Sequence, residues 1–312
     1  ASAQGAGRGR AVIRLDRAAG LAVVAGLAIL RGAAVFVDVS PSVLTAAPLL
    51  GPSSAHWLGT DQLGRDVLAR VIDGSEAFVV PGLLAVALAL LIGVPLGAGM
   101  GFWPRSPVST LGRFSLTIIG AWPRLVLVVV TVSIFTATVS DPAAFSGVRL
   151  YVLAAIVAIS FLPQLSEELA ERVLTFRREE FVEAARAHGL TDRRILVRHI
   201  LWANCREMLL RQCCLVFAAF LLVETSLSYL GDYGVPPPRP SWGNILSDVR
   251  AQVIHVRTLL RPDSPHPSDL AAGIERAVHE GAALALLAPT SMIVLSVAGL
   301  LALARSLGRE VR

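Results

Sequence analysis

The segment FVVPGLLAVALALLIGVPLGAGMGFW, residues 78–103, is the strongest indication of the fold class because it contains no charged side chain. A helix rises about 1.5 Å per residue, so roughly 20 apolar residues cross a bilayer core of about 30 Å. Residues 282–304 meet the same standard. Only 16% of the 312 residues are charged, whereas a soluble protein carries about 25%. The sequence therefore predicts an all-α integral membrane protein.

Four further segments are apolar enough to be membrane helices, although three of them contain charges. They are residues 18–39 with Arg31 and Asp38, 114–139 with Arg124, 150–166, and 208–231 with Arg211 and Glu224. We therefore predict about six transmembrane helices. Residues 18–39 are expected to be a retained helix, because Arg31 interrupts the apolar run that a cleaved signal peptide needs.

The predicted spans divide the chain into regions. Residues 1–17 form a cytoplasmic tail, 18–39 the first transmembrane helix, 40–77 an outer segment, 78–304 a core of five transmembrane helices, and 305–312 a second cytoplasmic tail. The core includes a cytoplasmic hairpin at 167–206 and an outer loop at 232–281.

Arginine sets the predicted orientation. The chain has 28 basic residues and no lysine. Seventeen arginines fall on the side of the hairpin and the two tails, and eight on the other side. Because basic residues concentrate in cytoplasmic loops, both ends of the chain and the hairpin are predicted to be cytoplasmic. The basic charge therefore reflects membrane topology rather than nucleic-acid binding.

Two helices are expected on the outer side. Val67, Leu68, Val71 and Ile72 form an apolar stripe beside Asp66 and Arg70, which have the i,i+4 spacing of an ion pair. This pattern predicts a short amphipathic helix, either on the membrane surface or packed on the bundle. The segment SWGNILSDVRAQVI in the outer loop has the spacing of a helix that lies along the bundle.

The hairpin is the most charged part of the chain. Residues 167–188 are predicted to form one helix, with Glu168 and Arg172 as an i,i+4 pair, and Gly189 is predicted to end it. Thr191 is placed to cap a second helix. In EAARAHG, Glu183, Ala184, Ala185 and Arg186 precede Gly189 and combine small side chains with charges. This composition favours a docking surface, although a solvated loop that only fixes topology remains an alternative.

Three segments carry a resemblance to a known family. EAA at 183–185, Gly189 and HIL at 199–201 resemble the EAA loop of bacterial ABC importer permeases. HWLGTDQLGRDVLARVIDG at 56–74 and ETSLSYLGDYGVPPPRPSWGNIL at 224–246 resemble the dipeptide, oligopeptide and nickel permease family, in particular its second permease subunit. Trp202 stands where that family usually has proline.

The resemblance implies a fold, partners and a site. The fold would be that of a type I ABC importer permease in the bacterial inner membrane, and the substrate would be di- or oligopeptides. The partners would be a second homologous permease, two ABC ATPase subunits and an external solute-binding protein. ATP and Mg²⁺ would bind the ATPase subunits, since a P-loop needs a lysine and this chain has none. The residues implied in ATPase coupling are Glu183, Ala184, Ala185, Arg186, Gly189 and His199.

Other readings stay open. Arg124 and Glu224 lie inside predicted spans, where charges are costly, so they are candidates for the translocation path or for a structural pair. Nickel is an alternative substrate, but His255, His266 and His279 match no metal motif and no metal site is expected. A self-contained secondary transporter or channel is a further alternative, which would leave the hairpin unexplained.

Overall fold

The structure is a computed structural model that describes residues 2–33, 50–61, 63–138, 142–231, 234–235, 239–249 and 282–309. Within these ranges it is helical apart from turns and one isolated bridge between Thr60 and Asp66. The helices are α1 (Ser2–Ala33), α2 (Val67–Asp73), α3 (Glu76–Phe102), α4 (Pro107–Gly120), α5 (Arg124–Thr138), α6 (Pro142–Phe176), α7 (Glu180–Ala187), α8 (Asp192–Arg194), η1 (Ile195–Cys205), α9 (Arg206–Leu230) and α12 (Ala282–Arg309). Residues 242–249 are also helical.

The predicted all-α membrane fold is confirmed. Four helical stretches are long and apolar enough to cross a membrane, namely Val67–Phe102, Val148–Phe176, Asp192–Leu230 and Leu284–Gly308. A fifth exists if the bent pair α4 and α5 is one span. The predicted total of six is not confirmed, because the expected span 18–39 is described only as far as the end of α1 at Ala33.

The segment predicted as one continuous span, 114–139, is bent in the structure. α4 ends at Gly120, α5 begins at Arg124, and the two helices meet at 82°. The cause is Pro123, which has no backbone N–H and disfavours the helical conformation at Trp122. A new helical hydrogen bond then starts from Leu127 N to the Pro123 carbonyl, 3.0 Å long.

Glycines bring α3 and α6 into close contact. Gly93, Gly97 and Gly101 recur every four residues along α3, so they share one face. A Cβ at Gly97 would lie 2.6 Å from the Ser166 carbonyl oxygen on α6. The Ser166 hydroxyl also donates a 3.2 Å hydrogen bond to the Gly93 carbonyl. Small residues at this spacing let membrane helices pack backbone to backbone, and they fix α6, which leads into the hairpin.

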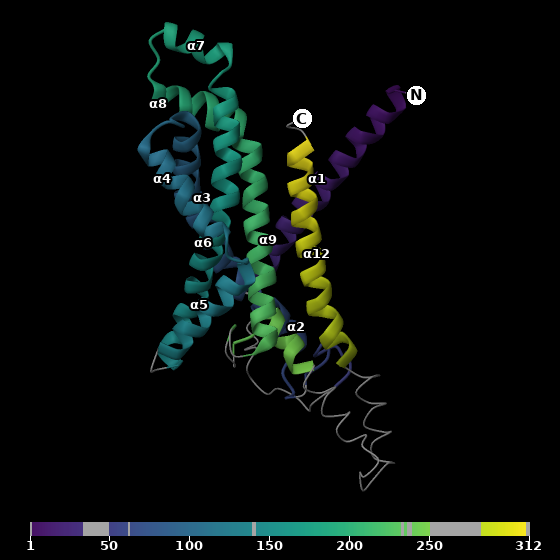
Figure 1. Cartoon of the computed structure of the whole chain (residues 1–312). Coiled ribbons are helices and arrows are strands. Elements are labelled where there is room, and N and C mark those ends of the chain that lie inside the picture. Colours follow the sequence, from purple (N-terminus) through teal and green to yellow (C-terminus); the bar gives the residue numbers. More distant parts are fainter. Residues whose placement is uncertain are drawn as a thin grey trace.

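Figure 1 shows that the long helices have two distinct ends. α7 and α8 lie beyond the ends of α6 and α9, and the beginning of α1 and the end of α12 point the same way. We call this the hairpin end. α2 lies toward the opposite end, which we call the α2 end. The shared direction of the hairpin and both termini agrees with the arginine distribution.

Four charged residues form a clamp at the α2 end. Arg65 Nε donates to Asp61 Oδ2 at 2.7 Å, and Arg70 Nη1 donates to the same oxygen at 2.6 Å. Both arginines also reach Asp248 Oδ2 at 2.9 Å, although Asp248 lies about 180 residues later in the chain. Asp61, Arg65 and Arg70 are buried. We call these four residues the outer clamp.

The outer clamp corrects one predicted pair. α2 confirms the predicted short helix, and it packs on the bundle, since Val67 and Val71 are buried. The expected Asp66–Arg70 pair is wrong, because Asp66 caps α2 by accepting from Ala69 N at 2.8 Å. Arg70 is therefore free to reach Asp61 and Asp248. The predicted helix of the outer loop is also present, at residues 242–249.

Trp242 fastens that helix to the bundle. It is fully buried, and its Nε1 donates a 2.8 Å hydrogen bond to the Val71 carbonyl of α2. Its ring also contacts Phe78 of α3, with 4.5 Å between ring centroids. The described part of the outer loop is therefore an integral part of the α2 end.

Candidate functional site

The hairpin at one end of the helices is the candidate functional site. α6 ends at Phe176, a three-residue turn follows, and α7 begins at Glu180. The single helix predicted over 167–188 is therefore divided in two. The turn contains neither glycine nor proline, so nothing local in the sequence marks it. Its effect is to turn α7 across the ends of the long helices (Figure 1).

Gly189 ends α7 as the sequence predicts. Its φ is +78°, in the left-handed region that glycine adopts without a steric penalty. Gly189 N donates to the Arg186 carbonyl at 2.9 Å, and Leu190 N donates to the Ala185 carbonyl at 3.1 Å. These bonds satisfy carbonyls that the helix end would otherwise leave unpaired. The hairpin turn is thus encoded locally.

The second arm of the hairpin starts at Thr191. Its hydroxyl accepts a weak 3.4 Å hydrogen bond from Arg194 N, which confirms the predicted cap. Asp192 accepts a 3.0 Å hydrogen bond from Arg186 Nε, so an ion pair ties the two arms together. α8 then continues as the π-helical segment η1 into the membrane helix α9.

The hairpin is anchored to the bundle by its apolar face. Val182 of α7 is fully buried, as are Ile195 and Ile200 of η1. Below them, the ring of Phe102 closes the end of α3, and the Arg186 guanidinium lies 5.8 Å from its centroid. A force applied to α7 therefore reaches α3 and η1 through side chains in contact.

The opposite face of the hairpin is open. Glu183, Ala184 and Gly189 are exposed, and Ala185 is half-buried. A Cβ at Gly189 would meet no atom within 4 Å. The face therefore presents the small residues Ala184 and Gly189 beside charged side chains. Arg186 is exposed as well, although it is held by Asp192.

His199 is not part of this face. It lies in η1, is half-buried, and its carbonyl accepts a 2.6 Å hydrogen bond from Asn204 Nδ2. Trp202, which is not among the residues predicted for ATPase coupling, is 73% exposed in the same segment. A large exposed aromatic side chain near the hairpin adds apolar surface to this end of the molecule. In the sequence, Trp202 stands out only because it occupies a position where the resembled family usually has proline.

A hydrogen-bonded network connects the two helices that enter and leave the hairpin. Arg211 of α9 forms an ion pair with Glu168 of α6, and Gln212 Nε2 donates to the other Glu168 oxygen at 2.5 Å. The predicted Glu168–Arg172 pair is wrong, because the Glu168 carboxylate faces α9. This network couples the positions of α6 and α9 at the base of the hairpin.

The two candidate path residues lie in separate surroundings. Arg124 begins α5, donates to Gln164 Oε1 at 2.6 Å, and lies over the Phe161 ring at 4.1 Å. Glu224 of α9 is fully buried and accepts a 2.7 Å hydrogen bond from Ser228 Oγ. The structure therefore does not bring the two charges together as a pair.

Metal binding finds no support in the described residues, where no three His, Cys, Asp or Glu side chains form a possible metal site. The predicted bystanders His255, His266 and His279 lie outside the described ranges.

Comparison with known proteins identifies relatives. Residues 93–312 match the family described as the binding-protein-dependent transport system inner membrane component. The dipeptide transport system permease protein DppC of Alkalihalophilus pseudofirmus is 33% identical over 202 residues, which are 65% of this chain and 62% of that protein. The glutathione transport system permease protein GsiD of Pectobacterium atrosepticum is 30% identical over 204 residues, 65% of this chain and 63% of the relative. A putative peptide transport system permease of Brucella suis is 31% identical over 199 residues, 64% of this chain and 62% of the relative. The matched region thus spans less than two thirds of each relative.

Proposed function

Because this chain belongs to the family of binding-protein-dependent transport system inner membrane components, we propose that it is a permease subunit of an ATP-driven importer of peptides. The observation that carries the proposal is the open hairpin face of Glu183, Ala184 and Gly189, held on a rigid base at one end of the membrane helices. A second protein can dock on this face and move the helices below it.

The proposed mechanism uses the contacts beneath the hairpin. An ATPase subunit pushes on α7, and buried Val182 passes the displacement to the bundle. The Glu168–Arg211 pair keeps α6 and α9 moving together. Dense glycine packing between α3 and α6 makes these helices move as one body, which is what alternating access by rocking requires. ATP and Mg²⁺ bind the ATPase subunits, since a P-loop needs a lysine and the 312 residues contain none.

Peptides are the proposed substrates. The relatives are named for dipeptide, glutathione and peptide transport, which favours peptides over nickel. The proposed assembly contains a second homologous permease, two ATPase subunits and a solute-binding protein at the α2 end. The hairpin end and both termini face the cytoplasm in this proposal, in agreement with the excess of arginine there.

Co-purification tests the proposal directly. The tagged chain is isolated from its native membrane, its partners are identified, and ATP hydrolysis by the complex is measured with and without peptides and their binding protein. We expect two ATPase subunits and a second permease to copurify, and hydrolysis to rise with the loaded binding protein. Transport by the chain alone, without an ATPase partner, would instead support a secondary transporter.

Replacing Arg124 by alanine tests the proposed role of this residue in the path. The change removes the hydrogen bond to Gln164 and the contact with Phe161, both near the bend between α4 and α5. We expect peptide uptake to fall by about tenfold, on the order of one charge-assisted contact, while the complex still assembles. Uptake and ATPase coupling are measured in vesicles. Normal uptake by a normally assembled variant would exclude Arg124 from the path, and loss of assembly would show that its role is structural.

A further inference from the structure

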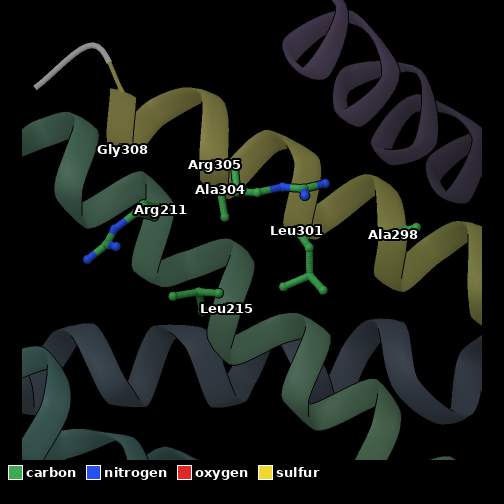
Figure 2. A pocket seen from close by; sticks show the side chains of 7 residues that line it. All are labelled: Arg211, Leu215, Ala298, Leu301, Ala304, Arg305 and Gly308. Carbon is green, nitrogen blue, oxygen red and sulfur yellow. The ribbon is translucent and has the colours of Figure 1, made fainter. Parts of the chain in front are cut away.

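A groove lies between α9 and α12 at the hairpin end, and of its lining residues only Arg211 belongs to the proposed coupling contacts. Its volume is about 660 Å³. Figure 2 shows the side chains that line it. Two residues of α9 and five of α12 line it, namely Arg211, Leu215, Ala298, Leu301, Ala304, Arg305 and Gly308. Both helices belong to stretches that are long and apolar enough to cross a membrane. The surroundings of the groove are therefore lipid as well as water.

The walls of the groove are apolar and partly made of small residues. Leu215 and Leu301 project into the space between the two helices in Figure 2, and Ala298 and Ala304 leave it open. An open apolar groove inside a bilayer does not stay empty, since lipid chains surround it and dispersion contacts with its walls are favourable. A saturated chain matches these walls without any polar partner.

Arg305 gives the groove its charge. It is exposed on α12, and Figure 2 shows its side chain extended along the helix in the direction of Leu301 and Ala298. Among the described residues, no carboxylate lies within ion-pair distance of its guanidinium. Arg211 is different, because it points away from Arg305 and is held by Glu168. Within the described part of the chain, Arg305 is therefore the cation of the groove that has no carboxylate partner.

We propose that this groove binds an anionic phospholipid. Its phosphate pairs with the Arg305 guanidinium, and one acyl chain lies against Leu301 and Leu215. Basic residues between membrane helices on the cytoplasmic side bind acidic headgroups through the combined attraction of charge and acyl burial. A helix of another protein would fill the apolar part but would pair with the guanidinium only if it carried an acidic side chain at that position. A phospholipid supplies both a phosphate for the guanidinium and an acyl chain for the apolar walls.

Lipid binding is tested on the purified full chain by native mass spectrometry during titration with phosphatidylglycerol or phosphatidylcholine. We expect phosphatidylglycerol to bind about fivefold more tightly, the effect of one basic residue near an acidic headgroup. The Arg305→Gln variant should bind both lipids equally. This variant is expected to fold, since the side chain is exposed and makes no ion pair with a described residue.

Two controls separate the groove from general charge attraction. Arg113→Gln removes an exposed arginine of α4, outside the groove, and should leave the preference unchanged. Leu301→Trp fills the groove and should weaken binding of both lipids while the chain elutes as a folded protein. Glycerol 3-phosphate has the same phosphate without acyl chains and should not displace the lipid.

Three results would overturn the proposal. The first is that Arg305→Gln keeps the preference for phosphatidylglycerol over phosphatidylcholine. The second is that Arg113→Gln loses this preference as much as Arg305→Gln does. The third is that glycerol 3-phosphate displaces the lipid. None of these measurements involves ATP, peptides or partner subunits, so the outcome is independent of the proposed transport function.

Discussion

Replacing Glu183 by arginine is expected to uncouple the permease from its ATPase without unfolding it. Glu183 is exposed on the open face of the hairpin, so the folded chain tolerates the change. A docking partner that receives a carboxylate there would instead meet a cation. Reversal of a charge at the centre of an interface costs several kcal/mol, so affinity for the ATPase should fall by about a hundredfold or more.

The measurement is the amount of ATPase subunit retained by the tagged permease, together with ATP hydrolysis and peptide uptake in vesicles. Glu171→Arg is the matched control, because it makes the same charge change at an exposed position of α6 before the hairpin. We expect this control to keep its ATPase. Equal retention by wild-type and Glu183→Arg would show that the open face does not dock an ATPase.

The second large effect is expected at the outer clamp. Arg70→Ala removes a buried guanidinium that contacts both Asp61 and Asp248. The change leaves Asp61 buried with one cation fewer. Breaking a buried ion pair by removing one partner costs about 3–5 kcal/mol, so the free energy of unfolding should fall by that amount. The helix at residues 242–249 should also become more accessible to proteases, since the outer clamp and Trp242 hold it.

Denaturant unfolding in detergent micelles, with limited proteolysis in parallel, measures both effects. Arg31→Ala serves as the control, because the Arg31–Glu76 pair at 3.1 Å is much more exposed than the outer clamp. An exposed pair contributes about 0–1 kcal/mol. If Arg70→Ala unfolds at the same denaturant concentration as Arg31→Ala, the outer clamp does not stabilise the fold.

Much of the candidate site follows from local sequence. Gly189 predicts the end of α7, Thr191 predicts the cap of α8, and the small residues Ala184 and Ala185 predict an open face. Each of these signals acts within a few residues, so the sequence alone carries it. The turn before Glu180 could not be predicted, because burial of Val182 against the bundle, rather than a helix-breaking residue, favours it.

Local sequence patterns were sufficient to predict that the chain is helical, that it enters the membrane, and where the hairpin lies. Apolar runs of 20 or more residues without charges favour helices in a membrane, since a helix satisfies its backbone polar groups within one segment. The pairing of the charged side chains, in contrast, depends on how the helices pack. Glu168 pairs with Arg211 rather than Arg172, and Arg70 pairs with Asp61 and Asp248 rather than Asp66. The spacing of residues describes contacts within one helix, whereas a buried charge takes its partner from whichever helix close packing places beside it.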